Sequence, residues 1–226
     1  MLLAYSRSGS ARVFLDIPDG TLEAVKWLAL LLMLADHINK YVLNSMYAAI
    51  FDAGRLAMPL FVMVFGINLA RANIDYKRII KRLFFFGVLS TPPFIAVGGT
   101  WAGWWPLNIL FTLLAITIIV FCYDKHSEQL AFFVFLLSGF FVEFFHPALI
   151  IGLGAWAYWK KPSIAASIAV VFGLSLLWVV NRNFWALVAL PLLIGLGRVN
   201  FGLKRNKWLF YGFYPAHLSL IWMLFE

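Results

Sequence analysis

The feature that most constrains the fold is a long apolar run at residues 24–42 that also contains ionisable side chains. A run of this length and apolarity is typical of a helix that crosses a membrane. Within it, the sequence KWLALLLMLADH places Lys26, Asp36 and His37 among Leu, Ala, Trp and Met. Ionisable residues are rare in such helices, and each one marks a candidate functional site. The run therefore predicts both a membrane protein and the region where its chemistry occurs.

Lys26 and His37 are predicted to lie on one face of that helix. Eleven residues make almost a whole number of turns, so the two side chains point the same way and are separated along the axis by roughly 16 Å. The face then has a lysine near its start and a histidine toward its far end. A lone histidine in a helical bundle is often a hydrogen-bonded packing residue, and that alternative stays open for His37.

Asp36 precedes His37 directly, but it is not expected to orient the imidazole ring. Adjacent residues on a helix point about 100° apart and do not face each other. A cation from another helix is the more natural partner for this carboxylate, and Arg55 is the leading candidate. The pair has two open interpretations, a structural ion pair and a catalytic role for Asp36.

Apolar runs recur along the whole chain. Of its 226 residues, 63% are apolar and 12% are charged, whereas a soluble domain has about half and a quarter. We therefore expect an all-α fold, a polytopic transmembrane helical bundle of about nine helices that forms one membrane-embedded domain over residues 22–226. A cytoplasmic segment at residues 1–21, without a cleaved signal peptide, precedes it. The helices are expected at residues 22–43, 55–71, 80–98, 106–123, 129–146, 147–160, 163–181, 184–199 and 207–225.

The distribution of Lys and Arg predicts the orientation of the bundle. Short cytoplasmic loops carry an excess of these residues. With a cytoplasmic N-terminus, all 18 basic residues fall on the inner side except Lys40, Arg55 and Arg182. The net charge of +8 is then explained largely by topology. We expect a multi-pass membrane protein that has the lipid bilayer and no nucleic acid as a partner, and the sequence leaves the oligomeric state open.

A second candidate site is the basic segment at residues 71–82, RANIDYKRIIKR. Arg78, Lys81 and Arg82 stand at i, i+3 and i+4, on one face of the helix that enters the membrane. Such a face could clamp the phosphates of a nucleotide-like ligand arriving from the cytoplasm. The alternative is an anchor that meets anionic lipid.

Two further pairs of polar residues stand within the expected helices. Asn108 and Thr112 are one turn apart on one face, and either cross-helix packing or a substrate contact explains them. Glu143 and His146 are three residues apart and could meet each other. A carboxylate inside a membrane is costly unless it is paired, which favours a functional interpretation of Glu143.

The last expected helix contains a polar cluster around a proline. Tyr211, Tyr214 and His217 surround Pro215, which frees backbone groups and could open the helix toward a cavity. The sequence has no GxSxG elbow, His-Glu-x-x-His site, Walker loop or Rossmann fingerprint. No metal site is therefore expected.

Five segments resemble the TraX family of pilin acetylation proteins from F-type conjugation systems. They are KWLALLLMLADH, GRLAMPLFVMVFG, YKRIIKRL, NILFT and FYGFYPAHL, and they spread the resemblance over residues 22–220. Lys26, ten residues and His37 are similar to the basic-x10-His signature of membrane acyltransferase-3 proteins. Arg78-Ile-Ile-Lys81 resembles their RxxR motif, with lysine in place of the second arginine. The sequence departs from the family at residues 142–145, where Val-Glu-Phe-Phe stands near an expected Asp-Tyr-Gly.

The resemblance implies an acyltransferase-like domain in the bacterial inner membrane that transfers an acetyl group from acetyl-CoA to the N-terminal amine of processed pilin. In this hypothesis His37 is the general base, and Glu143 or His217 orients its ring. An acetyl-histidine intermediate is an open alternative to direct transfer. The donor's phosphates would bind Lys26, Arg78, Lys81 and Arg82, and the candidate oxyanion donors are Arg55, Asn108 and Tyr214.

Two other functions stay open at this stage. The first keeps the chemistry but changes the acceptor, giving an O-acetyltransferase that acts on envelope glycans, as acyltransferase-3 proteins do. The second is a transporter in which Asp36, His37 and Glu143 form a proton pathway. Transporters often show repeated halves with matching broken helices, and no such repeat is visible in the sequence.

Overall fold

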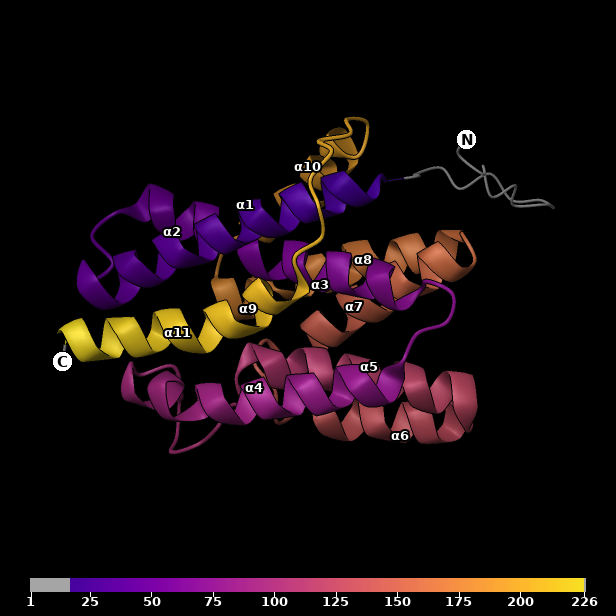
Figure 1. Cartoon of the computed structure of the whole chain (residues 1–226), viewed down its shortest axis with the longest axis horizontal. Helices are drawn as coiled ribbons and strands as arrows, with labels where there is room; N and C mark the ends of the chain where they lie inside the picture. Colours follow the sequence, from indigo (N-terminus) through magenta and orange to yellow (C-terminus); the bar gives the residue numbers. More distant parts are fainter. Residues whose placement is uncertain (1–16, 226) are drawn as a thin grey trace.

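The computed structural model describes residues 17–225 and shows an all-helical fold across them (Figure 1). No strand forms in this range, where the only sheet-like pairs are two isolated bridges. The predicted all-α class is therefore confirmed. Most of the expected cytoplasmic segment, including Arg7 and Arg12, lies outside the described residues.

Nine helical rods can be traced through residues 17–225, the number predicted, and several of them are made of two pieces. In chain order they are α1 (Asp19–His37) with the π-helical turn η1 (Ile38–Val42); α2 (Ala48–Gly54) with α3 (Ala57–Leu69); α4 (Tyr76–Ala96); α5 (Ile109–Lys125); α6 (Glu128–Ser138); α7 (Phe145–Lys160); α8 (Ile164–Leu176) with α9 (Trp178–Asn181); η2 (Trp185–Val188) with α10 (Ala189–Leu196); and α11 (Lys207–Phe225).

Three of these rods are long and apolar enough to cross a membrane. They are Ala48–Leu69, which joins α2 and α3, then α4, and Ile164–Asn181, which joins α8 and α9. Two shorter apolar helices, Glu128–Ser138 and Trp185–Leu196, accompany them. The fold is thus that of a helical protein with several candidate membrane spans.

The fifth helix was predicted too long. Instead of continuing to residue 146, α6 ends at Ser138, and the chain turns at the start of α7, where Phe144 and Phe145 have φ angles of 61° and 50°, outside the right-handed helical range. Backbone hydrogen bonds to Leu107 fix the turn on both sides: its N–H donates to Phe141 O at 2.7 Å, and its carbonyl accepts from Glu143 N at 2.8 Å. Glu143 therefore lies in a turn and not in a helix.

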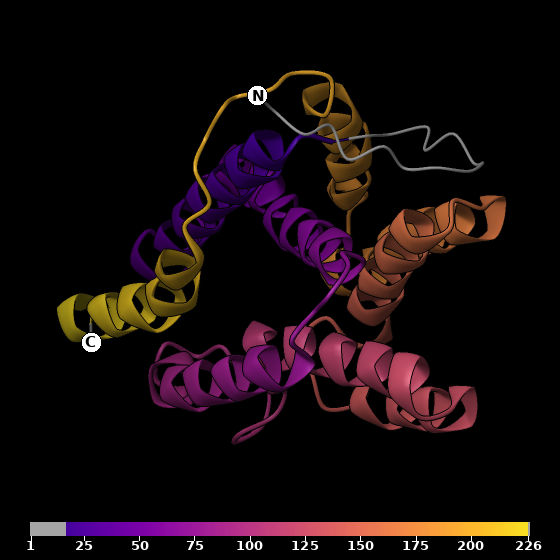
Figure 2. The same ribbon diagram turned by 45° about the vertical axis from the view of Figure 1, so that its right-hand side comes forward.

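The helix α3 lies at the centre of the bundle, with ten of its thirteen residues buried. It packs against α1, α5, α7 and α10. At Gly66 the backbone of α7 comes so close that a Cβ atom would lie 2.3 Å from Gly152 O. On the other side of the molecule, α11 packs on α4, and α4 packs on α5 (Figure 2).

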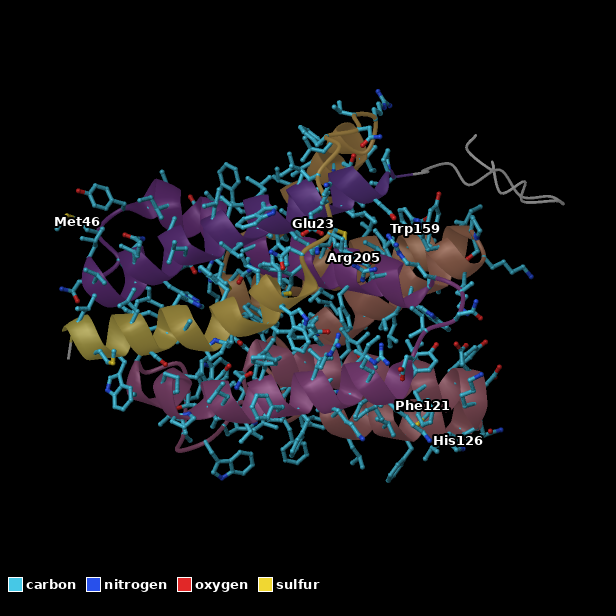
Figure 3. All side chains as sticks on the ribbon, viewed as in Figure 1. Glu23, Met46, Phe121, His126, Trp159 and Arg205 are labelled. Atoms are coloured by element: carbon cyan, nitrogen blue, oxygen red, sulfur yellow. The ribbon has the colours of Figure 1, made fainter. Side chains whose placement is uncertain are left out.

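The two ends of the bundle can be recognised by the labelled residues of Figure 3. Met46 marks one end, where α1 and α2 meet, and His126 and Trp159 mark the other. The helix α1 runs from the second end toward the first (Figure 1). Its histidine therefore lies near the end marked by Met46, and its lysine lies on the side of the other end.

Candidate active site

One cavity of about 1020 Å³ brings the predicted histidine and basic groups together. Its walls come from α1, the α2–α3 rod, α4, the start of α5 and α11. Tyr211 and Tyr214 of α11 line it, and α11 continues as one helix through Pro215. His37 and Asn181 line the cavity together with ten charged residues, which are Lys26, Asp36, Lys40, Arg55, Arg71, Asp75, Arg78, Arg82, Glu143 and Arg205.

His37 of α1 is held by a second histidine, His217 of α11. The planes of the two rings lie within 13° of each other, and His37 Nδ1 lies 2.8 Å from His217 Nε2. On its other side, His217 Nδ1 lies 2.9 Å from the backbone oxygen of Phe213. The rings belong to residues 180 positions apart in the chain, so only the fold brings them together.

This chain of contacts defines the tautomers of both rings. A carbonyl oxygen can only accept, so His217 Nδ1 carries the hydrogen that bonds to Phe213 O. The neutral His217 ring then has an acceptor at Nε2, and His37 must donate to it from Nδ1. The remaining nitrogen of His37, Nε2, is left with a free lone pair. A histidine whose second nitrogen is fixed in this way is oriented to act as a base.

Asp36 forms the ion pair that the sequence predicts. Its Oδ2 lies 2.5 Å from Arg55 Nη2, and Arg55 also donates from Nε to Phe51 O at 3.2 Å. Gly54 makes this arrangement possible, because a Cβ atom at that position would lie 2.5 Å from Asp36 Cβ. The glycine and arginine of the GRxxxP segment thus act together: one leaves room for the carboxylate and the other neutralises it.

The replacement Gly54→Ala is expected to lower the free energy of unfolding by about 1 to 3 kcal/mol, because the new methyl group overlaps Asp36. Gly195→Ala provides the matched control, since its Cβ would have nothing within 4 Å, and it should leave stability unchanged or raise it by up to about 1 kcal/mol. Thermal unfolding in detergent measures the stability of both variants and of the wild-type protein. Equal stability of the two variants would show that Asp36 moves aside freely.

Glu143 reaches the same cavity from the turn between α6 and α7. Thr112 donates its hydroxyl to Glu143 O at 2.9 Å, which assigns Thr112 to holding this turn. Burial raises the pKa of the Glu143 carboxyl to about 7, so near neutral pH it can both hold and release a proton. His146 is not its partner, contrary to the prediction: its Nε2 lies 3.2 Å from Leu136 O.

Of the three predicted oxyanion donors, Tyr214 and Arg55 line the cavity and Asn108 does not. The Asn108 amide is already engaged at the start of α5. Its oxygen accepts from Leu110 N at 3.1 Å, and its nitrogen donates to Gly87 O at 2.9 Å and to Thr91 Oγ1 at 3.3 Å. These bonds use both hydrogens of the amide, so Asn108 serves as a cap and a link between α4 and α5.

The basic face of α4 differs from the predicted one in one residue. Arg78, Ile79, Arg82 and Leu83 line the cavity, whereas Lys81 is exposed and does not. At 100° per residue, the four lining residues cover an arc of about 140° around the helix that begins at Arg78. Lys81 lies outside this arc, about 60° from Arg78 on the other side. Lys81 is therefore not among the basic residues that the cavity brings together, and its contribution to a phosphate site stays a prediction.

Lys26 lines the cavity but has a partner that the sequence analysis missed. Glu23, only 2% exposed, lies one turn earlier, and its Oε2 is 2.5 Å from Lys26 Nζ. Its Oε1 accepts from Asn206 N at 3.0 Å, which fastens the segment before α11 to α1. Lys26 also lies over the Phe210 ring, 4.2 Å from its centroid. The i, i+3 spacing of Glu23 and Lys26 in the sequence could have predicted this ion pair.

Arg71, Arg205 and Asn181 also line the cavity, although none of them was predicted as a catalytic, donor-binding or oxyanion residue. Arg71, at the end of α3, forms an ion pair with Asp19 and lines the cavity with Arg205. Asn181, at the end of α9, enters from the opposite end of the bundle. Arg71 had been included only as the first residue of the basic segment 71–82, Arg205 had been assigned only to an inner loop by charge, and nothing in the sequence marked Asn181.

Comparison with known proteins matches residues 21–225 to the family described as TraX protein. A curated relative named Protein TraX from Escherichia coli is 31% identical over 126 residues, which are 55% of this chain and 49% of the relative. Another Protein TraX, from Escherichia coli strain K12, is 31% identical over 120 residues, or 53% and 47%. The matched regions span about half the length of these relatives. No solved structure is significantly similar to the chain.

Proposed function

The chain belongs to the TraX family, and from that premise we propose that it transfers an acetyl group from cytoplasmic acetyl-CoA to the N-terminal amine of a conjugative pilin. One observation carries the proposal: a single cavity joins a group of arginines to a histidine whose free nitrogen is oriented as a base. This arrangement suits a long donor with phosphates at one end and a reactive thioester at the other.

The donor's phosphates would bind among Arg78, Arg82 and Arg205. Guanidinium groups bind phosphate oxygens through paired, charge-assisted hydrogen bonds. Lys26 adds a weaker contribution, because Glu23 already balances its charge. The thioester would then lie further along the cavity, near His37. The eleven residues of helix between Lys26 and His37 correspond to roughly 16 Å along the helix axis.

The reaction would begin with attack of the acceptor amine on the thioester carbonyl carbon. A free α-amine has a pKa of about 7.7 to 8, so part of it is neutral and nucleophilic near pH 7. His37 Nε2 takes the proton that the amine loses when the new C–N bond forms. Arg55 and Tyr214 line the cavity where they could stabilise the oxyanion. The C–S bond then breaks, and the proton passes from His37 to the thiolate to give free CoA.

His217 has the role of positioning His37 in this scheme. His217→Phe keeps an aromatic ring but removes the acceptor for His37 Nδ1, so kcat for acetyl transfer should fall about tenfold or more, the equivalent of one lost hydrogen bond. His217→Gln retains a side-chain oxygen that can accept, and it should recover part of the rate. Steady-state kinetics on purified variants measures both. Wild-type rates in both variants would remove His217 from the mechanism.

The proposal is tested in cells by mass spectrometry of the pilin N-terminus. Cells with the intact protein should yield acetylated pilin, and cells lacking it should yield the free amine. Re-expression of the wild-type chain should restore the acetyl group. Acetylated pilin in cells that lack the protein would show that another enzyme performs the reaction, and the proposal would then be rejected.

A further inference from the structure

Four buried polar atoms of side chains have no hydrogen-bond partner among residues 17–225. They are Asp36 Oδ1, Ser138 Oγ, Trp156 Nε1 and Asn181 Oδ1. Two of them, on Asp36 and Asn181, belong to residues that line the cavity, and the other two do not. Buried polar groups are normally paired in folded proteins, so two unpaired oxygens at one cavity require an explanation.

Asn181 and Asp36 approach the cavity from different elements at the same end of the bundle. Asn181 is 5% exposed and is the last residue of α9. Two positions later, Asn183 donates to Asp52 Oδ1 at 3.1 Å, which ties this part of the chain to α2. Asp52 lies three residues before Arg55, the partner of Asp36. Asp36, Arg55 and Asn181 therefore line the same cavity as His37, and the segment that follows Asn181 is fixed to the helix that precedes Arg55.

The chemistry of these atoms selects the group that would bind them. Both unpaired atoms are oxygens, so they require N–H or O–H donors. Asp36 already shares its charge with Arg55, and the near-neutral pair can accept a hydrogen bond from an amine without strongly favouring its protonated form. An asparagine amide offers one acceptor and two donors, which matches the N–H and C=O of a peptide group.

We propose that Asp36 and Asn181 form the subsite that binds the N-terminal residue of a peptide acceptor. The α-amine donates to Asp36 Oδ1, which holds it beside His37, and the Asn181 amide pairs with the first peptide group. This inference rests on the proposed acetyl transfer and adds to it a residue that selects the acceptor. Asn181 is a binding residue in this scheme and takes no part in proton transfer.

The test uses Asn181→Ala and Asn181→Leu, with acetyl-CoA and a peptide that has a free N-terminus. We expect the KM for the peptide to rise about tenfold, as for the loss of one or two hydrogen bonds, while the KM for acetyl-CoA stays unchanged. Ser138→Ala is the matched control, because Ser138 also has a buried unpaired oxygen but lies outside the cavity lining. That variant should leave both KM values unchanged.

The outcomes separate this inference from the function on which it rests. An unchanged peptide KM in both Asn181 variants, with active wild-type protein, would overturn the subsite and leave acetyl transfer standing. An equal rise in both KM values would also overturn it, since it would indicate a general structural role. If wild-type protein acetylates no peptide, the proposed function itself fails, and the inference fails with it.

Discussion

Replacement of His37 by alanine is expected to lower kcat for acetyl transfer by roughly 100- to 10,000-fold, the usual contribution of a positioned general base. The physical reason is that Nε2 is the ring nitrogen left without a hydrogen once the bond to His217 fixes Nδ1 as the donor. Stopped-flow or steady-state assays of CoA release, with saturating acetyl-CoA and peptide, measure this decrease in kcat.

His37→Gln is the informative companion to the alanine variant. Glutamine can still hydrogen-bond to His217 but cannot accept a proton, so its kcat should be as low as that of alanine. The KM for acetyl-CoA should change little in both variants, because the arginines lie elsewhere along the cavity. A glutamine variant that retains most of the wild-type rate would assign His37 to packing, the alternative that its sequence leaves open.

The second large effect is expected when the arginines of the cavity lose their charge together. In a variant with Arg78→Gln, Arg82→Gln and Arg205→Gln, the KM for acetyl-CoA should rise at least about 100-fold. Each charge-assisted hydrogen bond contributes about 1.5 to 3 kcal/mol, although neighbouring contributions do not add fully. Isothermal titration calorimetry with acetyl-CoA in detergent should show the same weakening as a rise in Kd.

Lys81→Gln is the control for this experiment, and it also decides between two descriptions of the basic face. Lys81 belongs to the RxxR-like segment, yet it is exposed and does not line the cavity. Its replacement should therefore change the KM by no more than about twofold, as for an ordinary surface substitution. A loss comparable with that of the triple variant would place the donor's phosphates outside this cavity.

Local sequence patterns were sufficient to predict the helices and the contacts that helical spacing controls. Long apolar runs gave nine rods, and the eleven-residue spacing of Lys26 and His37 placed both on the cavity. The ion pair between Asp36 and Arg55 was also predicted, because a buried carboxylate requires a cation from another helix. The membrane spans and their orientation stay predictions beyond the three candidate helices.

Contacts between distant segments were the part that the sequence could not specify. His217 was one of two residues predicted to orient His37, and no local pattern could choose between them; the structure brings His217 into contact. The turn before α7 was missed because Phe144 and Phe145, both bulky, adopt positive φ angles that sequence patterns do not anticipate. Asn181 was missed because a single polar residue near a helix end carries no signal of its own.

The most direct test of the account is transfer by the purified protein to a peptide that matches the processed N-terminus of pilin. With acetyl-CoA, the wild-type chain should add one acetyl group to the peptide's α-amine, located by tandem mass spectrometry, and release an equal amount of free CoA. His37→Ala should add almost none. Equal acetylation by wild type and His37→Ala, or none by folded wild-type protein, would contradict the account.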